Sequence, residues 1–414
     1  MKKIFAIVLL AIMLLLTCRS SQYQPSPPET AHIKPGIEVL LDSQRNLAAN
    51  KRVGLITNAT GITSDFTTTI DALFQAPDIE LVALFGPEHG VRGDIPAGDV
   101  VPQYTDPVTG VPVYSLYGQT REPTPEMLEN LDILMYDIQD IGSRGYTYIY
   151  TMAYAMEAAE ENDIPFIVLD RPNPLGGNRV EGNVLEPEFS SFIGLYPIPY
   201  VYGMTVGELA KLFNTEFDIN CNLTVVPMEG WERDMLYDDT GLPWVPTSPH
   251  VPHSSTPIFV AATGCIGELN TVSIGVGYTS PFELIGAPWI NENEYAKELN
   301  DKKLPGVHFR PMTFKPFYFH FTNELCRGIQ IHITDKDIFS PSRTQLYLLS
   351  TLYNLHPDND IFDTPRISSF DKAYGTDQVR EAIVNGIPVE NILSSWNVDL
   401  DKFNIIRSKY LIYP

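Results

Sequence analysis

Short, continuous apolar runs followed at once by polar residues recur through the first half of the chain. Their length and continuity are typical of strands buried on both faces of a sheet. Four such runs predict strands, at residues 53–56, 81–85, 133–136 and 166–169. Segments predicted to be helical lie between them, at residues 65–75, 124–131 and 148–162. Alternating strands and helices at this spacing predict right-handed crossovers and a mostly parallel sheet.

The polar residues that follow these four runs form the candidate site. In a parallel sheet the carboxyl ends of the strands meet at one edge, and ligands bind in the crevice outside that edge. We expect the following residues to converge there: Asn58 after the first run, Glu88, His89 and Arg92 after the second, Asp137, Gln139, Asp140, Arg144 and Tyr146 after the third, and Asp170, Arg171 and Asn173 after the fourth.

The second run ends in a dense cluster of charge. Glu88, His89 and Arg92 are crowded between a proline and two glycines, so the chain turns sharply where the strand stops. A carboxylate, an imidazole and a guanidinium on one such turn indicate a site, although a turn whose charges point to water is the alternative. Asp170 and Arg171 have an alternative too, as a self-paired and rigid loop before a proline.

The second half of the chain has a different pattern. Isoleucines alternate with polar residues over residues 329–334, which predicts a half-buried strand. Helices are predicted at residues 340–355 and 376–385. No cluster of catalytic residue types occurs there, although Glu283 is a candidate to face the site.

The N-terminal residues are predicted to lie outside the fold. Residues 4–16 are apolar throughout, follow two lysines and are too short for a comfortable membrane span. They end in Leu-Leu-Thr-Cys at Cys18, which resembles a bacterial lipobox, so residues 1–18 are interpreted as a lipoprotein signal peptide and residues 19–35 as a tether. A lipid on Cys18 would anchor an exported protein to a membrane, on the periplasmic side of a bacterial envelope. Cleavage and secretion without a lipid is the alternative.

Composition and motifs exclude several classes of protein. The chain of 414 residues is 44% hydrophobic, as a globular protein is, and its formal net charge of −23 argues against nucleic acid as a partner. No glycine-rich nucleotide fingerprint follows the first strand, and neither a nucleophile elbow nor a zincin motif is present. His250 and His253 lie in a proline-rich stretch and not at helical spacing, so no metal and no cofactor are predicted.

The remaining candidates suit sugar chemistry. Carboxylates with amide, arginine and tyrosine neighbours are typical of sites that recognise sugars and cleave glycosidic bonds. Two rivals belong to other classes. One is a lipid-anchored glycan-binding protein without chemistry, and the other is a nucleotide-dependent enzyme on the same kind of sheet.

Segments spread over nearly the whole chain resemble the NamZ-type exo-β-N-acetylmuramidase family. They are GLITN at residues 54–58, PEHGVRG at 87–93, SLYG at 115–118, DIQDIGSR at 137–144, LDRPNP at 169–174, EG at 181–182, GMTVGEL at 203–209, GW at 230–231 with Arg233, PFE at 281–283 and GAPW at 286–289. The resemblance implies an α/β fold with a Rossmann-like N-terminal domain and a smaller α/β C-terminal domain. We place them at residues 36–253 and 254–414, with the second domain completing the cleft.

The resemblance also implies an activity. Members release N-acetylmuramic acid from the non-reducing end of peptidoglycan fragments, so such saccharides are the expected partners. The glutamate of the family's P-E-H-G motif is held to be catalytic; here it is Glu88, which we expect to act as a general acid. Asp137 and Asp140 are the candidates for a second catalytic group, as nucleophile, as water-activating base or by orienting the substrate's acetamide. The expected substrate-binding residues are Asn58, His89, Arg92, Gln139, Arg144, Tyr146, Asp170, Arg171, Asn173 and Glu283.

Two segments depart from the family pattern. Residues 247–253 read TSPHVPH where many members have P-S-P-N-x-P-T, and residues 273–279 read SIGVGYT where many have S-E-G-R-G-T. The second change removes a glutamate and an arginine. An arginine there would suit the lactyl carboxylate of muramic acid, so its loss bears on the sugar or leaving group accepted and not on the reaction type.

Overall fold

The computed structural model describes residues 33–88, 90–93, 103–118 and 120–414. The predicted signal peptide, nearly all of the predicted tether, and His89 lie outside the described residues. No helix in the described part of the chain is long and apolar enough to cross a bilayer.

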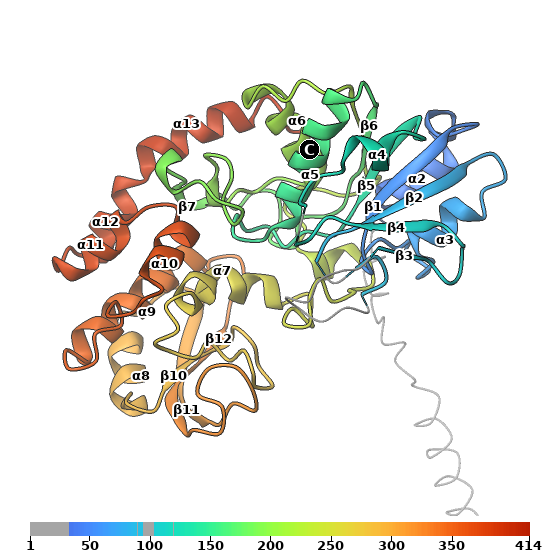
Figure 1. Cartoon of the computed structure of the whole chain (residues 1–414). Helices are drawn as coiled ribbons and strands as arrows, with labels where there is room; N and C mark the ends of the chain where they lie inside the picture. Colours follow the sequence, from blue (N-terminus) through green and yellow to red (C-terminus); the bar gives the residue numbers. More distant parts are fainter. Residues whose placement is uncertain (1–32, 89, 94–102, 119) are drawn as a thin grey trace, which may run out of the picture. The chain divides into compact units, whose positions relative to one another are not determined.

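A seven-stranded sheet forms from strands between residues 52 and 226, in the part of the chain drawn from blue to yellow-green in Figure 1. Its strands follow the order β3-β4-β2-β1-β5-β6-β9, and all neighbours pair in parallel except β3 with β4. Their bounds are β1 (Arg52–Thr57), β2 (Glu80–Gly86), β3 (Tyr104–Thr105), β4 (Pro112–Ser115), β5 (Ile133–Asp137), β6 (Phe166–Leu169) and β9 (Leu223–Val226). The mostly parallel α/β fold predicted from the sequence is therefore confirmed.

The strand order reverses between β1 and β5. From β1 the chain first adds β2 and β4 on one side and then returns to add β5, β6 and β9 on the other. Thr57, the last residue of β1, pairs with Asp137, the last residue of β5. Such a reversal opens a crevice outside the carboxyl ends of the two strands, which is where parallel sheets bind ligands.

Alternating strand residues supply two apolar layers, one on each face. Tyr136 packs on one face with α5 (Tyr148–Glu161) and α6 (Val206–Glu216). Its neighbour Met135 packs on the other face with α2 (Gly36–Asp42) and α3 (Thr69–Phe74). Strands covered on both faces must be apolar throughout, which is why these runs could be recognised in the sequence.

The predicted strands are confirmed, and two of the predicted helices are shorter than expected. The helix predicted from residue 65 begins at Thr69, because residues 62–68 form a turn closed by a bridge between Ile62 and Thr68. The Thr68 side chain then caps the helix by accepting from the Asp71 N–H at 3.1 Å. The helix predicted at residues 124–131 is shorter, α4 (Pro125–Leu128).

The second half of the chain contributes a three-stranded antiparallel sheet, in the order β10-β12-β11. Its strands are β10 (Leu284–Ala287), β11 (Val307–Phe314) and β12 (Cys326–Ile333), which contains the predicted strand. A further pair consists of β7 (Glu181–Val184) and β8 (Pro199–Val201). The helices of this half are α7 (Thr256–Gly267), α8 (Glu292–Asp301), α9 (Pro341–Leu355), α10 (Ile367–Tyr374), α11 (Gln378–Val384), α12 (Val389–Ser395) and α13 (Asn397–Arg407).

Two predicted helices of this half are confirmed. The helix predicted at residues 340–355 is α9; its first residue is Pro341, and the Ser340 hydroxyl caps it by accepting from the Arg343 N–H at 3.3 Å. The helix predicted at residues 376–385 is α11, and Gly386 follows it with φ +68°, a conformation that favours glycine.

Candidate active site at the carboxyl edge of the sheet

Glu88 lies on a tight turn directly beyond β2 and is half-buried. The Gly90 N–H donates to the Pro87 carbonyl oxygen at 3.1 Å, and Gly90 has φ +73°. Gly93 has φ +76°, and a Cβ placed on it would come within 2.9 Å of the Ala59 side chain. Glycines therefore let the chain turn sharply and pass close to the end of β1 while it presents Glu88.

Two tyrosines border Glu88. Burial, followed by the nearby charge of Glu88, raises the pKa of Tyr117, which lies just beyond β4. Burial also raises the pKa of Tyr148, the first residue of α5, with the neighbouring Tyr146 and then Glu88 adding to it. The carboxylate therefore lies between residues supplied by three elements, β2, β4 and α5.

A cavity of about 270 Å³ lies beside this turn. It is lined by Asn58, Ala59, Gly93 and residues 245–249. The Tyr146 hydroxyl donates to the Thr247 hydroxyl at 2.9 Å, and the Tyr148 hydroxyl donates to the Thr247 carbonyl oxygen at 2.7 Å. The same tyrosine that borders Glu88 thus fixes one wall of the cavity.

Asn58 is held in that cavity wall by its own turn. Its Oδ1 accepts from the Thr60 N–H at 2.9 Å and from the Thr60 hydroxyl at 2.5 Å. Asn58 and Tyr146 are therefore the predicted binding residues that the structure places with Glu88. His89 lies outside the described residues.

Asp137 and Arg171 form a buried ion pair. Both side chains are at most 4% exposed, the Arg171 Nη2 donates to Asp137 Oδ2 at 2.9 Å, and the Arg171 Nε donates to Asp137 Oδ1. The Thr69 hydroxyl also donates to Asp137 Oδ2, and Arg171 donates to the Ile62 carbonyl oxygen at 2.8 Å. The two predicted residues are brought together, but they contact each other and the backbone.

Gln139 and Asp140 are buried where β5 ends. The Tyr202 hydroxyl and the Gly142 N–H donate to Asp140 Oδ2, and burial raises the pKa of this carboxyl to about 6. Gln139 donates to the Pro172 carbonyl oxygen at 2.7 Å. Asp140 Oδ1 and Gln139 Oε1 are both buried and accept no hydrogen bond from the residues described.

Asp170 and Asn173 are fixed by internal contacts. Asp170 accepts from the Thr205 hydroxyl at 2.7 Å, the Gly207 N–H at 2.8 Å and the Tyr413 hydroxyl at 2.5 Å. Burial raises the pKa of Asp170 to about 7. The Asn173 side chain is likewise buried, and its amide donates to the Met204 carbonyl oxygen at 2.9 Å.

Arg144 joins distant parts of the chain. Its buried guanidinium donates to the carbonyl oxygens of Asn183 and Ile198, each at 2.8 Å, and to that of Tyr374 at the end of α10. The three predicted residues Asp170, Asn173 and Arg144 therefore stabilise the fold around the site.

The two remaining predicted residues lie in different surroundings. Arg92 follows Glu88 on the turn, and its Nε donates to Asp106 at 2.6 Å while its Nη2 donates to Asp71 at 3.1 Å. This pairing holds the pKa of Asp106 down, at about 2. Glu283 precedes β10 in the smaller sheet, where its carbonyl oxygen accepts from the Ile331 N–H at 2.9 Å.

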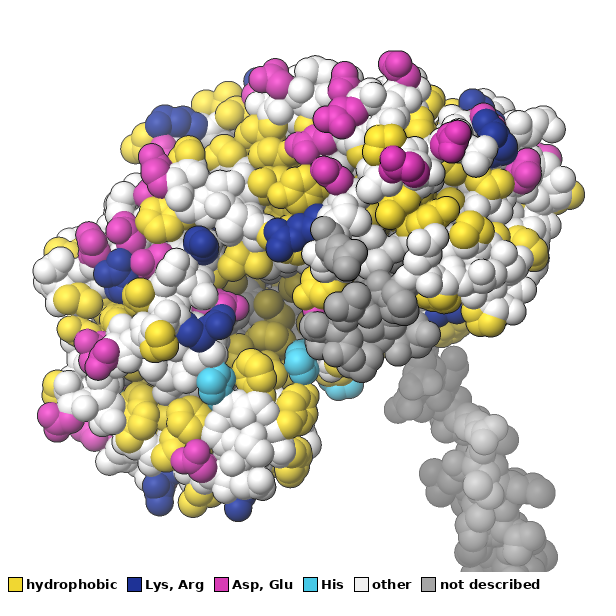
Figure 2. Space-filling model, in the orientation of Figure 1, with side chains coloured by type: hydrophobic (Ala, Val, Ile, Leu, Met, Phe, Trp, Pro, Cys, Tyr) yellow, Lys and Arg dark blue, Asp and Glu magenta, His cyan; other side chains and the backbone are white. Residues whose placement is uncertain are grey.

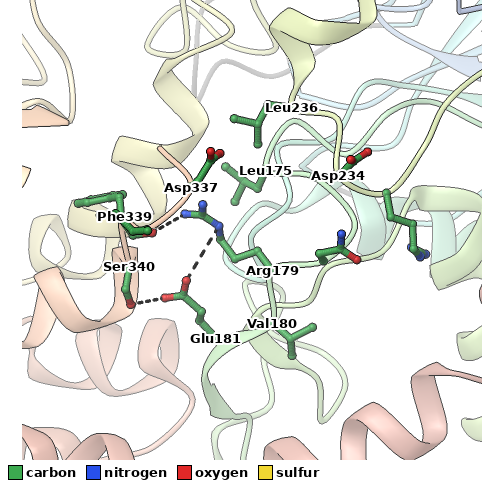
Figure 3. Close-up of a pocket in the computed structure, with 13 residues that line it drawn as sticks. Leu175, Arg179, Val180, Glu181, Asp234, Leu236, Asp337, Phe339 and Ser340 are labelled. Atoms are coloured by element: carbon green, nitrogen blue, oxygen red, sulfur yellow. Dashed lines mark hydrogen bonds and ion pairs between the residues drawn. The ribbon is translucent and has the colours of Figure 1, made fainter. Parts of the chain in front are cut away.

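A larger cavity of about 430 Å³ lies elsewhere, between residues 175–181, 233–236 and 337–340 (Figure 3). Arg179 points across it and donates to the Phe339 carbonyl oxygen at 2.9 Å, and Glu181 accepts from the Ser340 hydroxyl at 2.6 Å. None of the predicted site residues lines it. We therefore place the candidate site at the smaller cavity beside Glu88, which combines an accessible carboxylate with the carboxyl ends of β1 and β2.

The described residues contain no group of three or more histidine, cysteine, aspartate or glutamate side chains arranged to hold a metal ion. The chemistry on offer at the smaller cavity is that of a half-buried carboxylate with tyrosine hydroxyls and an amide. Such a set can exchange a proton and hydrogen-bond the hydroxyl groups of a sugar.

Comparison with known families decides the relationship. The sequence models of "Exo-beta-N-acetylmuramidase NamZ", N-terminal and C-terminal, match residues 53–255 and 260–413. The chain belongs to the NamZ exo-β-N-acetylmuramidase family. The boundary predicted at residue 253 falls close to where the two matches meet, and whether the two parts are separate domains stays a prediction.

Individual relatives agree with the family assignment. The chain is 51% identical to the peptidoglycan β-N-acetylmuramidase NamZ of Bacillus subtilis (strain 168) over 416 aligned residues, which cover all of both proteins. It also resembles two crystal structures of DUF1343 family proteins from Bacteroides fragilis NCTC 9343. The first has a TM-score of 0.88 and 48% identity, covering 93% of this chain and 100% of that chain, and the second has 0.76 and 31%, covering 92% and 99%.

Sequence reasoning missed three residues of the site. Tyr148 was given no role beyond the start of a predicted helix, because a tyrosine in an apolar helix gives no sign of which way its hydroxyl points. Tyr117 stood in a family-like segment without an assigned role, and Thr247 in one of the departing segments. Only Tyr117 had a signal in the sequence, its place in a segment that resembles the family; Tyr148 and Thr247 reach Glu88 and the cavity only through the fold.

Proposed function

We propose that this chain is an exo-acting glycoside hydrolase that releases N-acetylmuramic acid from the non-reducing end of peptidoglycan fragments. The observation that carries the proposal is the 51% identity, over the full length, to a curated peptidoglycan β-N-acetylmuramidase. Nothing in the comparisons favours the rival of a glycan-binding protein without chemistry.

Glu88 is the proposed general acid. It would protonate the glycosidic oxygen as the bond to the muramic acid ring breaks; water supplies the new hydroxyl at the anomeric carbon, and the proton that the water releases restores the Glu88 carboxylic acid by the end of the cycle. The position of Glu88 supports this role, because its carboxylate is half-buried just beyond β2, beside the cavity and between Tyr117 and Tyr148. Asn58 is proposed to contact the sugar from the cavity wall, and Tyr146, which donates to Thr247 of that wall, to contact it from behind. His89, next to Glu88 in the sequence, is proposed to contact it too.

Asp137 and Asp140 are proposed to position the site. That either acts directly on the substrate stays a prediction, but their contacts favour the indirect role. Both Asp137 oxygens accept from Arg171, and both carboxylates are at most 5% exposed. For either carboxylate to reach an anomeric carbon in the cavity, it would first have to leave its buried position and break its present hydrogen bonds.

The chain is further proposed to be exported and anchored by a lipid on Cys18, on the periplasmic side of a bacterial envelope. Cys18 lies outside the described residues, so the support is the apolar segment and the lipobox-like end in the sequence. Replacing Cys18→Ser should move the protein from the membrane fraction of cells to the soluble fraction. Unchanged fractionation would count against the anchor.

The activity is tested by incubating the purified protein with the disaccharide MurNAc-GlcNAc and with a chromogenic N-acetylmuramic acid glycoside. Free N-acetylmuramic acid should appear from both, and from longer fragments only one residue at a time from the non-reducing end. Saturable binding without any released sugar would overturn the proposal in favour of the non-catalytic rival.

A further inference from the structure

The connection between β11 and β12 exposes three consecutive aromatic residues, which we call the aromatic loop. Phe317, Tyr318 and Phe319 are 65%, 51% and 61% exposed. The two strands pair up to Phe314 and Cys326, so residues 315–325 form a connection much longer than the tight turn that an antiparallel pair requires. Contiguous exposed apolar surface of this kind usually marks a place where something binds.

The backbone of the loop holds the aromatic rings in a defined arrangement. Phe319 has φ +68° and Phe321 has φ +57°, a left-handed conformation that bulky residues rarely adopt. The Phe317 N–H donates to the Gly277 carbonyl oxygen at 2.7 Å, and the Thr322 hydroxyl donates to the Phe319 carbonyl oxygen at 2.6 Å. Strain kept in place by such contacts is typical of functional segments.

The loop is continuous with the candidate site. The Tyr318 hydroxyl lies 3.0 Å from His250 Nε2, and the two rings stack with their centroids 6.0 Å apart. His250 follows the segment that lines the cavity, and in that segment Thr247 is bonded to Tyr148, the neighbour of Glu88. In the space-filling view, histidine and hydrophobic side chains gather at the edge of a hollow on this face (Figure 2).

Both segments that depart from the family pattern meet at this loop. His250 belongs to residues 247–253, and Gly277 and Tyr278 belong to residues 273–279. A Cβ on Gly277 would come within 2.0 Å of the Tyr318 carbonyl oxygen, so only a glycine at residue 277 lets the backbone of the aromatic loop pack this closely against it. The Tyr278 ring lies 5.5 Å from that of Phe317. Gly277 is shared with the family pattern, whereas His250 and Tyr278 are not, so each departing segment supplies one residue that contacts the loop.

We propose that the aromatic loop is a stacking platform for the sugar on the leaving-group side of the cleaved bond, an N-acetylglucosamine ring. The proposal rests on the proposed function. An exo-acting pocket holds the terminal sugar, so the next ring of the glycan has to emerge at the border of the cavity. The Lys and Glu side chains of residues 315–325, Lys315 and Glu324, lie near the ends of the connection, and burial, followed by the charge of Arg366, lowers the pKa of His320 and favours its neutral form. The tip therefore suits an uncharged ring with an apolar face.

The test compares two substrates that differ only on the leaving-group side. The double variant Phe317→Ala with Phe319→Ala is assayed on MurNAc-GlcNAc and on a chromogenic N-acetylmuramic acid glycoside, which has no sugar there. Its KM for the disaccharide should rise about tenfold with kcat little changed, since losing aromatic stacking typically costs affinity of that order. Both constants for the chromogenic glycoside should stay within about twofold of wild type.

Two kinds of control variant accompany this test. Each single loop variant should show a smaller rise in KM for the disaccharide. Phe74→Ala, which removes an exposed phenylalanine at the end of α3, should show no rise.

An equal loss on both substrates, or no loss on either, would overturn the platform. So would a loss confined to fragments that carry peptides, which would identify a peptide as the occupant. A second measurement does not depend on turnover. Titration of the disaccharide into Glu88→Gln protein, with and without the two loop substitutions, should show about tenfold weaker binding when they are present. Unchanged affinity would refute the platform, whereas a wild-type protein that releases no sugar would refute the proposed function alone.

Discussion

Polar residues follow every central strand of the larger sheet, but the two sides of the switch point use them differently. On the β5 and β6 side, Asp137 is bound by Arg171 and Asp170 accepts from a tyrosine, a threonine and backbone N–H groups, all in the interior. On the β1 and β2 side, Glu88 is half-buried and Asn58 lines a cavity. One side stabilises the fold, and the other is open to a ligand.

The difference shows that a polar residue after a strand indicates a site only when it also borders a cavity or solvent. A charge that is paired in the interior is costly to disturb, because its partner is left buried and uncompensated. A half-buried carboxylate beside a cavity can change its partner when a substrate arrives. The two sides should therefore respond to substitution in opposite ways, the first in stability and the second in turnover.

Arg171→Gln should give the largest effect and should act on stability. It leaves the fully buried Asp137 carboxylate without its cation, which typically costs about 3–5 kcal/mol. The free energy of unfolding from urea denaturation measures it. Protein that remains folded should lose less activity than the Glu88→Gln variant does, because Arg171 contacts the strand ends and not the cavity.

Arg52→Gln is the matched control for that loss. Arg52, the first residue of β1, pairs with Asp132, just before β5, at 2.9 Å, but both side chains are well exposed. Water replaces such a partner readily, so the unfolding midpoint should hardly change. If both variants unfold at the wild-type midpoint, the interior of the β5 and β6 side does not depend on its ion pair.

Glu88→Gln should give the opposite result. The amide has nearly the same shape but cannot donate the proton that the leaving oxygen needs, so kcat should fall by at least about 100-fold. The unfolding midpoint should stay close to that of the wild type. Release of N-acetylmuramic acid and urea denaturation measure the two quantities on the same protein.

Glu80→Gln is the control on the same strand. Glu80 is exposed at the opposite end of β2, so its substitution should leave both turnover and stability unchanged. Wild-type turnover in Glu88→Gln would remove Glu88 from the proposed mechanism. A large loss of stability in that variant would place it with the interior residues instead.

The sequence was sufficient to predict the central strands because burial on both faces leaves an unbroken apolar run, as in β6 (Phe166–Leu169), which was predicted with its bounds. Short edge strands carry no such signal. β3 (Tyr104–Thr105) is too short, and β4 (Pro112–Ser115) and β9 (Leu223–Val226) are only partly buried, so their alternation is lost among the neighbouring residues. Those three strands were not predicted.

The sequence was enough to predict which residues lie at this edge of the sheet, but not which hydrogen-bond partners each of them has. That Glu88, Asn58 and Asp137 lie at one edge follows from strand order. Arg144 donates to the carbonyl oxygen of Tyr374, and Asp170 accepts from the Tyr413 hydroxyl. In each of these two contacts the partners are more than 200 residues apart along the chain. No local pattern reports such contacts, so interior and accessible residues looked alike in the sequence.

The smallest expected effect is a pH dependence of the free energy of unfolding that comes from the buried carboxyl of Asp140, on the interior side of the sheet. Burial raises its folded pKa to about 6, above the 3.8 of a free aspartate, so the folded protein favours the protonated carboxyl. The stability that this protonation contributes is fully present below about pH 4 and is lost as the pH rises through about 6.

Asp140→Asn removes that dependence, because the amide keeps an oxygen to accept from Tyr202 and Gly142 but cannot ionise. Relative to wild type, the free energy of unfolding of the variant should increase by about 1–3 kcal/mol between about pH 4 and about pH 7.5. Asp132→Asn is the control, since Arg52 holds the pKa of Asp132 at about 2 and its contribution is therefore lost only at lower pH. A difference from wild type that is constant over this range would mean that Asp140 is solvated in the folded protein and belongs with the open side of the sheet.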